Sequence, residues 1–424
     1  MKPLLLKRRG GASLLAFTTG RAPLRHRPPA GLQCERMNDL EALWAFLVAG
    51  AVALVLTPLA RQLAHRVGAI DLPRERSLHD RPTPSLGGLA ILAGVLVAGV
   101  LFLPWNSETR GILGGAAAIA FIGAVDDARK EGLSPFLKLA GQFAAAAIPV
   151  FSEVRVENIT LPFVDPLDLG NWGIPLTLVG MVAVMNVVNF TDGVDGLAAG
   201  VCTIAAATFA IIALSLDRLD AAVLAAAVAG AAVGFLRHNF HPASIFMGDS
   251  GSNLLGLLLA SVAIQGVLKT AAVVALFFPL VILAVPALDA TFVVVKRIKY
   301  RRPVYSADRW HFHHRFANIG FSARKTVLYL YTWTVSLAAL ALALRFVPYS
   351  DDDGALNAGW AIVMAAFGLL AVAASIYLVL VLEILKFRRF RERQLRRQAF
   401  TQEEIDDEIE REIETGEFDP VSGG

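Results

Sequence analysis

Carboxylate and amide side chains cluster at a few points of an otherwise hydrophobic sequence. They are Asp126, Asp127, Asn189, Asp192, Asp195 and Asp249. Because an Asp at the centre of a membrane span costs about 2.5–3.5 kcal/mol, such residues are candidate functional groups. Oxygen ligands without cysteine favour Mg²⁺ over zinc. The alternative is structural: an Asx-rich turn at Asn186–Gly196, and Asp249 as the N-cap of a helix that begins at Asn253.

Imidazole and guanidinium groups gather in a second segment, where His311, His313, His314 and Arg315 follow Arg309. A cationic loop of this kind can clamp phosphate groups through charge-assisted hydrogen bonds. Zinc binding is the alternative, although a fourth ligand is not evident in the sequence.

The composition predicts a membrane protein with several spans. The chain has 424 residues, of which 55% are hydrophobic and 18% are charged. Its mean hydropathy is +0.57, a value that soluble globular domains do not normally reach. Cys34 and Cys202 lie far apart, so a disulfide framework and a cysteine-based metal site are excluded.

Apolar runs of about 17–25 residues recur from Leu40 onward, each long enough to cross the bilayer as a helix. They predict an all-α transmembrane bundle of about eleven spans, near residues 40–60, 86–104, 110–125, 135–151, 173–190, 196–215, 221–237, 253–268, 271–295, 326–347 and 359–385. Basic loops alternate with acid-rich loops, which places the N-terminus outside and the C-terminus in the cytoplasm. Most of the acidic residues and the His-rich loop then share the cytoplasmic face.

Both ends of the chain are charged. Residues 1–36 carry eight Lys and Arg against the single acid Glu35, and a basic leader outside the first span violates the positive-inside rule. We therefore expect translation to start at Met37. A disordered basic arm is the alternative, and a transit peptide is a third for a eukaryotic source. Residues 37–385 form the predicted transmembrane catalytic domain, and residues 386–424 form a charged cytoplasmic tail.

Five ordered motifs make the sequence similar to the polyprenyl-phosphate N-acetylhexosamine-1-phosphate transferases, a family of membrane enzymes. They are Asp71-Leu-Pro with His79, Pro82, Pro84, Gly87 and Gly88; Asp126-Asp127 with Lys138; Asn186–Gly196; Arg237–Ser252; and His311–Arg315. One such motif would be weak evidence, whereas five in order are specific. The resemblance covers roughly Leu40–Tyr331 and favours the undecaprenyl-phosphate N-acetylglucosaminyl 1-phosphate transferase branch.

The resemblance implies a reaction assisted by Mg²⁺, with Mn²⁺ as an alternative ion. N-acetylglucosamine 1-phosphate would pass from UDP-N-acetylglucosamine to undecaprenyl (polyprenyl) phosphate with release of UMP, which initiates lipid-linked cell-envelope glycan synthesis. The expected partners are these two substrates and membrane lipid, with no nucleic acid, and a homodimer is left open. The expected location is the bacterial inner membrane, with the active site on its cytoplasmic side.

The resemblance also implies roles for individual residues. Asn189 and Asp249 would hold Mg²⁺; Asp192, Asp195 and Asn239 would contact the nucleoside or support the site; Asp126 or Asp127 would orient or deprotonate the acceptor phosphate; Lys138 would offset its charge; His313, His314 and Arg315 would clamp phosphates; and Arg76, His79 and His311 are further substrate-binding candidates.

Two departures and two alternatives bear on the substrate. Arg74 and Ser77 stand where the family's first loop often has Asn and Lys. His-Phe-His-His-Arg at 311–315 is similar to the N-acetylglucosaminyl branch, rather than the His-His-His-Phe-Glu of the muramoyl-pentapeptide branch, which is the alternative function. A secondary transporter would also hold carboxylates in a bundle of broken helices, but near the midplane instead of at span ends.

Overall fold

The computed structural model describes residues 39–73, 81–129, 131–159, 167–268, 283–299, 322–348 and 357–380, together with residues 407 and 411. Helices dominate these ranges: α1 (Asp39–Val67), α2 (Gly87–Phe102), α3 (Ser107–Ala128), α4 (Pro135–Phe151), η1 (Gly170–Trp172), α5 (Gly173–Thr191), α6 (Leu197–Ser215), α7 (Leu219–Asn239), α8 (Gly248–Ala263), η2 (Ile264–Leu268), α10 (Ala284–Lys299), α12 (Ala323–Phe346) and α13 (Ala358–Leu380). Two antiparallel strand pairs accompany them: β1 (Ile70–Asp71) with β2 (Thr83–Pro84), and β3 (Asn158–Ile159) with β4 (Leu167–Asp168).

Seven segments of the described residues are helical, long enough and apolar enough to cross a membrane: Leu40–Val67, Ser107–Ala128, Gly170–Thr191, Leu197–Ser215, Leu219–Asn239, Ala323–Phe346 and Ala358–Ser375. Shorter apolar helices occupy Gly87–Phe102, Pro135–Phe151 and Ala284–Val295. The chain is therefore an all-α, multi-pass membrane protein. Large apolar side chains remain exposed on the outer helices, among them Leu369 of α13 at 71%.

Each predicted span overlaps a helix in the described part of the chain, and three of the differences in boundaries are large. α1 continues to Val67, beyond the expected end near residue 60, since its polar last turns also remain helical. α8 begins at Gly248, five residues before the expected start. α10 begins at Ala284, and residues 269–282 of the predicted ninth span lie outside the described ranges.

Helix α8 is the buried centre of the bundle. Residues 250–263 are all buried, and α2, α3 and α5 pack against the helix. Its N-terminal end is tied to α2, because the backbone N–H groups of Gly87 and Gly88 donate to the carbonyl oxygens of Phe246 and Met247 at 2.9 and 3.0 Å. The unpaired N–H groups that begin a helix thus fix the segment that leads into α8.

Helices α1 and α7 pack backbone against backbone. A Cβ atom at Gly234 would lie 2.2 Å from the carbonyl oxygen of Gly50, so this contact requires glycine. Further along α7, Nε2 of His238 lies 3.2 Å from the carbonyl oxygen of Leu54. That carbonyl receives no helical hydrogen bond, because Pro58 lies four residues later and has no N–H. His238 supplies the missing donor.

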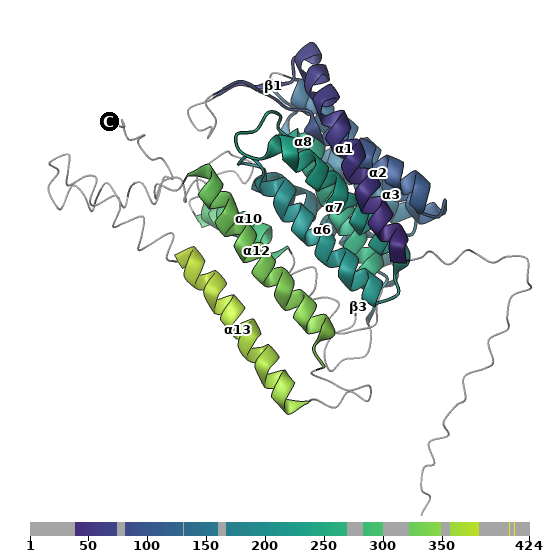
Figure 1. Cartoon of the computed structure of the whole chain (residues 1–424), viewed down its shortest axis with the longest axis vertical. Helices are drawn as coiled ribbons and strands as arrows, with labels where there is room; N and C mark the ends of the chain where they lie inside the picture. Colours follow the sequence, from purple (N-terminus) through teal and green to yellow (C-terminus); the bar gives the residue numbers. More distant parts are fainter. Residues whose placement is uncertain are drawn as a thin grey trace, which may run out of the picture. The chain divides into compact units, whose positions relative to one another are not determined.

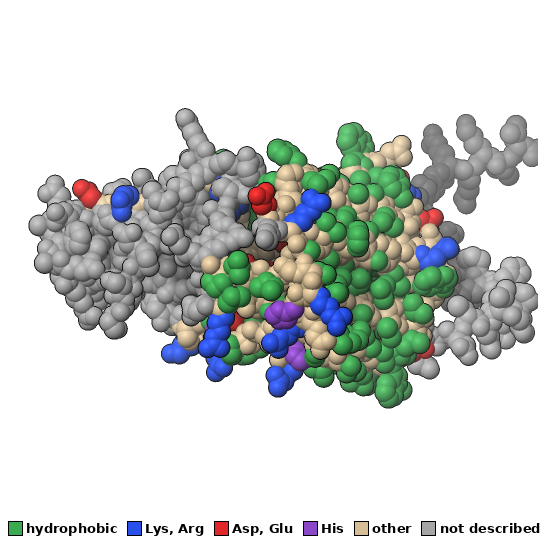
Figure 2. All heavy atoms as spheres, turned by 90° about the horizontal axis from the view of Figure 1, so that it is seen from above, with side chains coloured by type: hydrophobic (Ala, Val, Ile, Leu, Met, Phe, Trp, Pro, Cys, Tyr) green, Lys and Arg blue, Asp and Glu red, His purple; other side chains and the backbone are tan. Residues whose placement is uncertain are grey.

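The strand pairs lie at the two ends of the bundle (Figure 1), and charged side chains gather on the end that Figure 2 shows. β1 and β3 lie at opposite ends (Figure 1). Figure 2, viewed from above, shows Lys, Arg, His and acidic side chains on the end surface, with hydrophobic side chains around the flank. A polar end surface above apolar flanks is the pattern expected where a helix bundle leaves the hydrocarbon.

Candidate active site

Three acidic residues from two helices meet at the polar start of α8. Asp126 and Asp127 lie in the last turn of α3, and Asp249 lies in the first turn of α8. One carboxylate oxygen from each lies within 4.8 Å of the others. Gly123 makes this approach possible, because a Cβ atom there would lie 2.4 Å from the backbone of Ser250. The structure therefore brings two predicted acidic motifs into one cluster.

A cation and an amide complete the cluster from two further helices. Nζ of Lys138, in α4, lies 2.7 Å from Oδ2 of Asp126 and 2.8 Å from Oδ2 of Asp249. Nδ2 of Asn189, in α5, donates to Oδ1 of Asp249 at 2.9 Å and to Oγ of Ser252 at 2.9 Å. The Lys138 side chain is 38% exposed, so the cluster is open on its side. Four helices thus position one small group of charges.

Asp127 differs from its neighbour Asp126 in what it contacts. Its carboxylate accepts the backbone N–H groups of Asp249 and Ser250 at 2.9 and 3.2 Å. It therefore satisfies the start of α8 from another helix, where a negative charge is also favoured. The structural alternative for Asp249 is wrong: α8 starts at Gly248, Met247 occupies the N-cap position, and the Asp249 carboxylate faces Lys138 instead.

Asp195 is held by the loop between α7 and α8. Its Oδ2 lies 2.8 Å from Nδ1 of His241 and accepts the backbone N–H of Ala243 at 2.9 Å. Asp195 thus joins the α5–α6 junction to the α7–α8 loop. His241 was not among the predicted site residues, although its place two residues after Asn239 in the Arg237–Ser252 motif was the available signal.

Asn239 supports the same junction. It is only 2% exposed, accepts the backbone N–H of Gly196 at 3.0 Å and donates to the carbonyl oxygen of Ile245 at 3.1 Å. The hydroxyl of Tyr331, in α12, donates to the carbonyl oxygen of Gly196. Of the two roles predicted for Asn239, these contacts favour support of the site.

Asp192 lies directly after α5, between two of the apolar helices long enough to span a membrane. The electrostatic environment of its carboxylate is unfavourable. Burial raises the pKa of its carboxyl to about 8, and the carboxylates of Asp249 and Asp127 add to the effect. At neutral pH this carboxyl is therefore mostly protonated unless a cation approaches. A site with this excess of acids is suited to a positively charged ligand.

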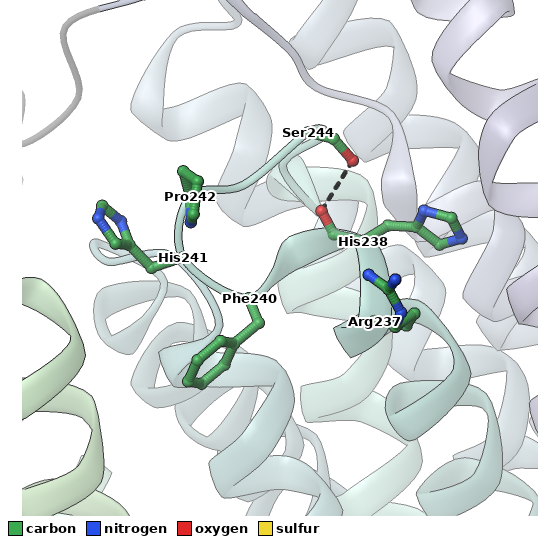
Figure 3. Close-up of a pocket in the computed structure, with 6 residues that line it drawn as sticks. All are labelled: Arg237, His238, Phe240, His241, Pro242 and Ser244. Carbon is green, nitrogen blue, oxygen red and sulfur yellow. Dashed lines mark hydrogen bonds between the residues drawn. The ribbon is translucent and has the colours of Figure 1, made fainter.

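A surface pocket of about 370 Å³ lies beside the α7–α8 loop. It is lined by Arg237, His238, Phe240, His241, Pro242 and Ser244. Figure 3 shows the side chains of His241 and Arg237 on opposite sides of the opening, with the Phe240 ring between them and below. The Ser244 hydroxyl donates to the carbonyl oxygen of His238 at 2.9 Å and stiffens the rim. Basic side chains around an aromatic ring suit a ligand with both anionic and flat apolar parts.

Comparison with known proteins identifies the family. Residues 109–267 match glycosyl transferase family 4. A probable undecaprenyl-phosphate N-acetylglucosaminyl 1-phosphate transferase of Bacillus subtilis is 38% identical over 313 residues, which cover 73% of this chain and 86% of the relative. The chain belongs to glycosyl transferase family 4. It is therefore an enzyme of the transferase class.

Two further relatives of this family 4 transferase carry different names. A decaprenyl-phosphate N-acetylglucosaminephosphotransferase of Mycobacterium tuberculosis is 35% identical over 388 residues, covering 84% of this chain and 91% of the relative. A phospho-N-acetylmuramoyl-pentapeptide-transferase of Caldanaerobacter subterraneus is 33% identical over 313 residues, covering 70% and 96%. The predicted resemblance to polyprenyl-phosphate sugar-1-phosphate transferases is confirmed.

The family match contains every predicted site residue that the structure describes. The six candidates Arg76, His79, His311, His313, His314 and Arg315 lie outside the described residues. The contacts within the described cluster therefore concern the acids, Lys138 and Asn189, and the phosphate-clamp prediction stays a prediction.

Proposed function

We propose that this family 4 transferase moves N-acetylglucosamine 1-phosphate from UDP-N-acetylglucosamine to undecaprenyl (polyprenyl) phosphate and releases UMP. The observation that carries the proposal is the meeting of Lys138 with Asp126 and Asp249 at one end of a membrane bundle. The names of the relatives from Bacillus and Mycobacterium support the same donor sugar and the same class of lipid acceptor. The product would be a lipid-linked sugar that starts a cell-envelope glycan.

Phosphoryl transfer between two anionic substrates depends on positioning and charge neutralisation. Lys138 would offset the charge of the acceptor phosphate, since its ammonium already bridges two carboxylates and is partly exposed. Asp126 is the better candidate than Asp127 to orient or deprotonate that phosphate. Asp127 uses both oxygens on the α8 backbone, whereas Asp126 accepts the backbone N–H of Leu133 with Oδ1 and contacts Lys138 with Oδ2. We therefore propose chemistry for Asp126 and support for Asp127.

The oxygen-rich donor set fits a hard divalent cation such as Mg²⁺. Asp249 would hold the ion, with Asn189 as the second predicted ligand and Asp126 close enough to contribute. When bound, Mg²⁺ would supply charge neutralisation for the donor pyrophosphate. The Nδ2 atom of Asn189 faces Asp249, so this amide also orients the carboxylate. Mn²⁺ is the alternative ion.

The remaining predicted residues complete the proposed substrate site. Asp192 and Asp195 would contact or support the nucleoside part, and the fixed loop around Asp195 is consistent with that role. The residues outside the described ranges keep their predicted parts: His313, His314 and Arg315 as phosphate clamp, with Arg76, His79 and His311 as further contacts to substrate.

We propose an eleven-span topology in a bacterial inner membrane, with the N-terminus outside, the C-terminus in the cytoplasm and the active site on the cytoplasmic face. The basic and acid-rich loops support this orientation. The opposite placement of β1, which follows a basic segment, and β3, which lies in an acid-containing loop, agrees with it (Figure 1).

Transfer of phospho-N-acetylmuramoyl-pentapeptide is the second candidate function, favoured by the relative from Caldanaerobacter. A secondary transporter has less support, because Asp126 and Asp127 end α3, Asp192 follows α5 and Asp249 starts α8. Carboxylates at helix ends suit a site on one face of the membrane, whereas transport sites lie near the midplane.

The test is a transfer assay in membranes that contain the protein. Labelled UDP-N-acetylglucosamine and UDP-N-acetylmuramoyl-pentapeptide are offered as competing donors, with undecaprenyl phosphate as the acceptor. Label in the organic extract is measured together with UMP release. We expect preferential labelling from UDP-N-acetylglucosamine. Preferred use of the pentapeptide donor would promote the second candidate, and transport without lipid labelling would reject both.

A further inference from the structure

A chain of three carboxamides, two of them buried, lies beside the acidic cluster. Nδ2 of Asn186, in α5, donates to Oε1 of Gln142, in α4, at 2.9 Å. Nε2 of Gln142 donates to Oδ1 of Asn253, in α8, at 2.7 Å. Nδ2 of Asn253 then donates to the carbonyl oxygen of Asp249 at 2.9 Å. The chain therefore runs in one direction and ends on the backbone of the central acid.

The spacing of these residues repeats the spacing of the cluster. Lys138 and Gln142 are four residues apart on α4, and Asp249 and Asn253 are four residues apart on α8. Residues four apart lie on the same face of a helix, about one turn from each other. The Lys138–Asp249 contact of 2.8 Å is thus matched one turn away by the Gln142–Asn253 contact of 2.7 Å.

The third helix follows the same arrangement. Asn189 contacts Asp249 in the charged layer, and Asn186, three residues earlier on α5, contacts Gln142 in the amide layer. Helices α4, α5 and α8 therefore meet twice, first through charged groups and then through neutral amides. The amide layer fixes the relative position of the same three helices that carry the charged layer.

The burial of the amides makes their pairing strict. Gln142 and Asn253 are each 6% exposed, and a buried amide that loses its partner pays the cost of desolvation without compensation. Gln142 uses its oxygen toward Asn186 and its nitrogen toward Asn253, so a sideways or axial shift of α4 would break both bonds. A fully paired polar layer can in this way select one register between helices.

We infer that Gln142 is a positioning residue for the transfer reaction: it sets α4 against α8 so that Lys138 reaches Asp249. This inference rests on the proposed function and adds a residue to its site. Gln142 contacts no reacting group itself. Its effect passes through the position of Lys138 and through the Asn253 hydrogen bond to the first turn of α8.

The primary test is Gln142→Met, which keeps a long unbranched side chain but can neither donate to Asn253 nor accept from Asn186 in the same way. Loss of an outer partner of a metal site typically lowers activity or metal affinity about 10–100-fold. We expect kcat to fall at least about tenfold while KM for the nucleotide sugar stays within about twofold. Mn²⁺ affinity, measured by electron paramagnetic resonance, falls in parallel.

The matched control is Ser261→Ala, on the same helix α8. Ser261 is fully buried and donates to the carbonyl oxygen of Leu257 at 2.9 Å, three turns from Asp249. This variant removes a buried hydrogen bond without touching the amide layer. We expect its kcat and Mn²⁺ affinity to match the wild type, whatever its thermal stability.

A double variant separates positioning from simple stability. Gln142→Met leaves the buried Oδ1 of Asn253 without its donor. Adding Asn253→Leu removes this unpaired acceptor, so apolar packing restores much of the thermal stability. The hydrogen bonds that fix α4 against α8 are still lost. We expect stability to recover while kcat stays low. Recovery of kcat together with stability would overturn the inference, as would kcat and Mn²⁺ affinity in Gln142→Met equal to those of Ser261→Ala.

Failure of the proposed function gives a different result. Wild-type membranes that transfer no sugar phosphate to lipid would remove the function, irrespective of any variant. Mn²⁺ binding still decides the positioning role in that case, because equal affinity in wild type and Gln142→Met would reject it.

Discussion

The carboxylate of Asp127 accepts the backbone N–H of Asp249 at 2.9 Å, although 122 residues separate the two acids. A residue at the end of α3 therefore completes the first turn of α8. Because Asp127 caps that turn, the side chain of Asp249 has no capping role and faces Lys138 and Asn189. Asp127 therefore stabilises the start of the helix, and Asp249 presents its carboxylate to the site.

The first prediction concerns Asp127→Ala. Alanine offers no acceptor to the backbone N–H groups of Asp249 and Ser250, and it lacks the charge that favours a helix N-terminus. We expect a loss of stability of about 1–2 kcal/mol, measured by denaturant titration in micelles, with a smaller effect on kcat than Asp126→Ala causes.

The matched control for Asp127→Ala is Asn106→Ala. Asn106 caps the start of α3 by accepting the N–H of Thr109 at 2.8 Å, remote in sequence from Asp126 and Asp127 at the other end of that helix. It should lower stability by a similar amount and leave turnover unchanged. A stability equal to wild type in Asp127→Ala would contradict the capping assignment.

The second prediction is that Asp249→Asn abolishes most turnover. Loss of one metal carboxylate removes several kcal/mol of charge stabilisation, and each 1.36 kcal/mol is roughly tenfold in rate, so we expect about a hundredfold loss or more. A cap would tolerate Asn, since Asn and Asp cap helices about equally well. Rates are compared across Mg²⁺ concentrations at matched yield and thermal stability. Activity near wild type at low Mg²⁺ would withdraw Asp249 as the metal anchor.

The limits of the sequence are visible at the same helix. Apolar periodicity predicted a span near 253–268, but α8 begins at Gly248, because its first N–H groups are satisfied by Asp127 rather than by a local cap. The acidic motifs could be recognised from residue type and family resemblance. The role of Gln142 could not be recognised in this way. An isolated glutamine in an apolar run indicates no function until its hydrogen-bond partners on α5 and α8 are known.

The third prediction concerns pH and Asp192. Its carboxyl has a pKa raised from 3.8 to about 8 in the folded protein. The folded state therefore binds more protons than the unfolded state between these values, so this group's contribution to stability is full below about pH 4 and is lost as the pH rises to about 8. Asp192→Asn removes that loss. In EDTA, we expect the thermal stability of Asp192→Asn to exceed that of the wild type by more at pH 8 than at pH 5.

The control for this pH series is Asp168→Asn, because Asp168 is an exposed residue of β4. Its stability profile should run parallel to the wild type across the range. Parallel profiles for Asp192→Asn as well would show that the Asp192 carboxyl is ionised in the folded protein, contrary to the assigned pKa.

The last prediction concerns the contact between His238 and Leu54. The Leu54 carbonyl lacks a helical donor because Pro58 has no N–H, and Nε2 of His238 lies 3.2 Å away. Since a carbonyl oxygen only accepts, Nε2 must carry the proton.

Pro58→Ala would return a backbone donor to Leu54 and make the imidazole less necessary. The free-energy cost of His238→Ala should therefore be smaller in the Pro58→Ala background than in the wild type. A double-mutant cycle on the free energy of unfolding in micelles measures this coupling, which we expect to be about 0.6 kcal/mol, the average for hydrogen bonds between membrane helices. Equal costs of His238→Ala in both backgrounds would show that the imidazole packs against α1 without replacing the hydrogen bond that the proline removes.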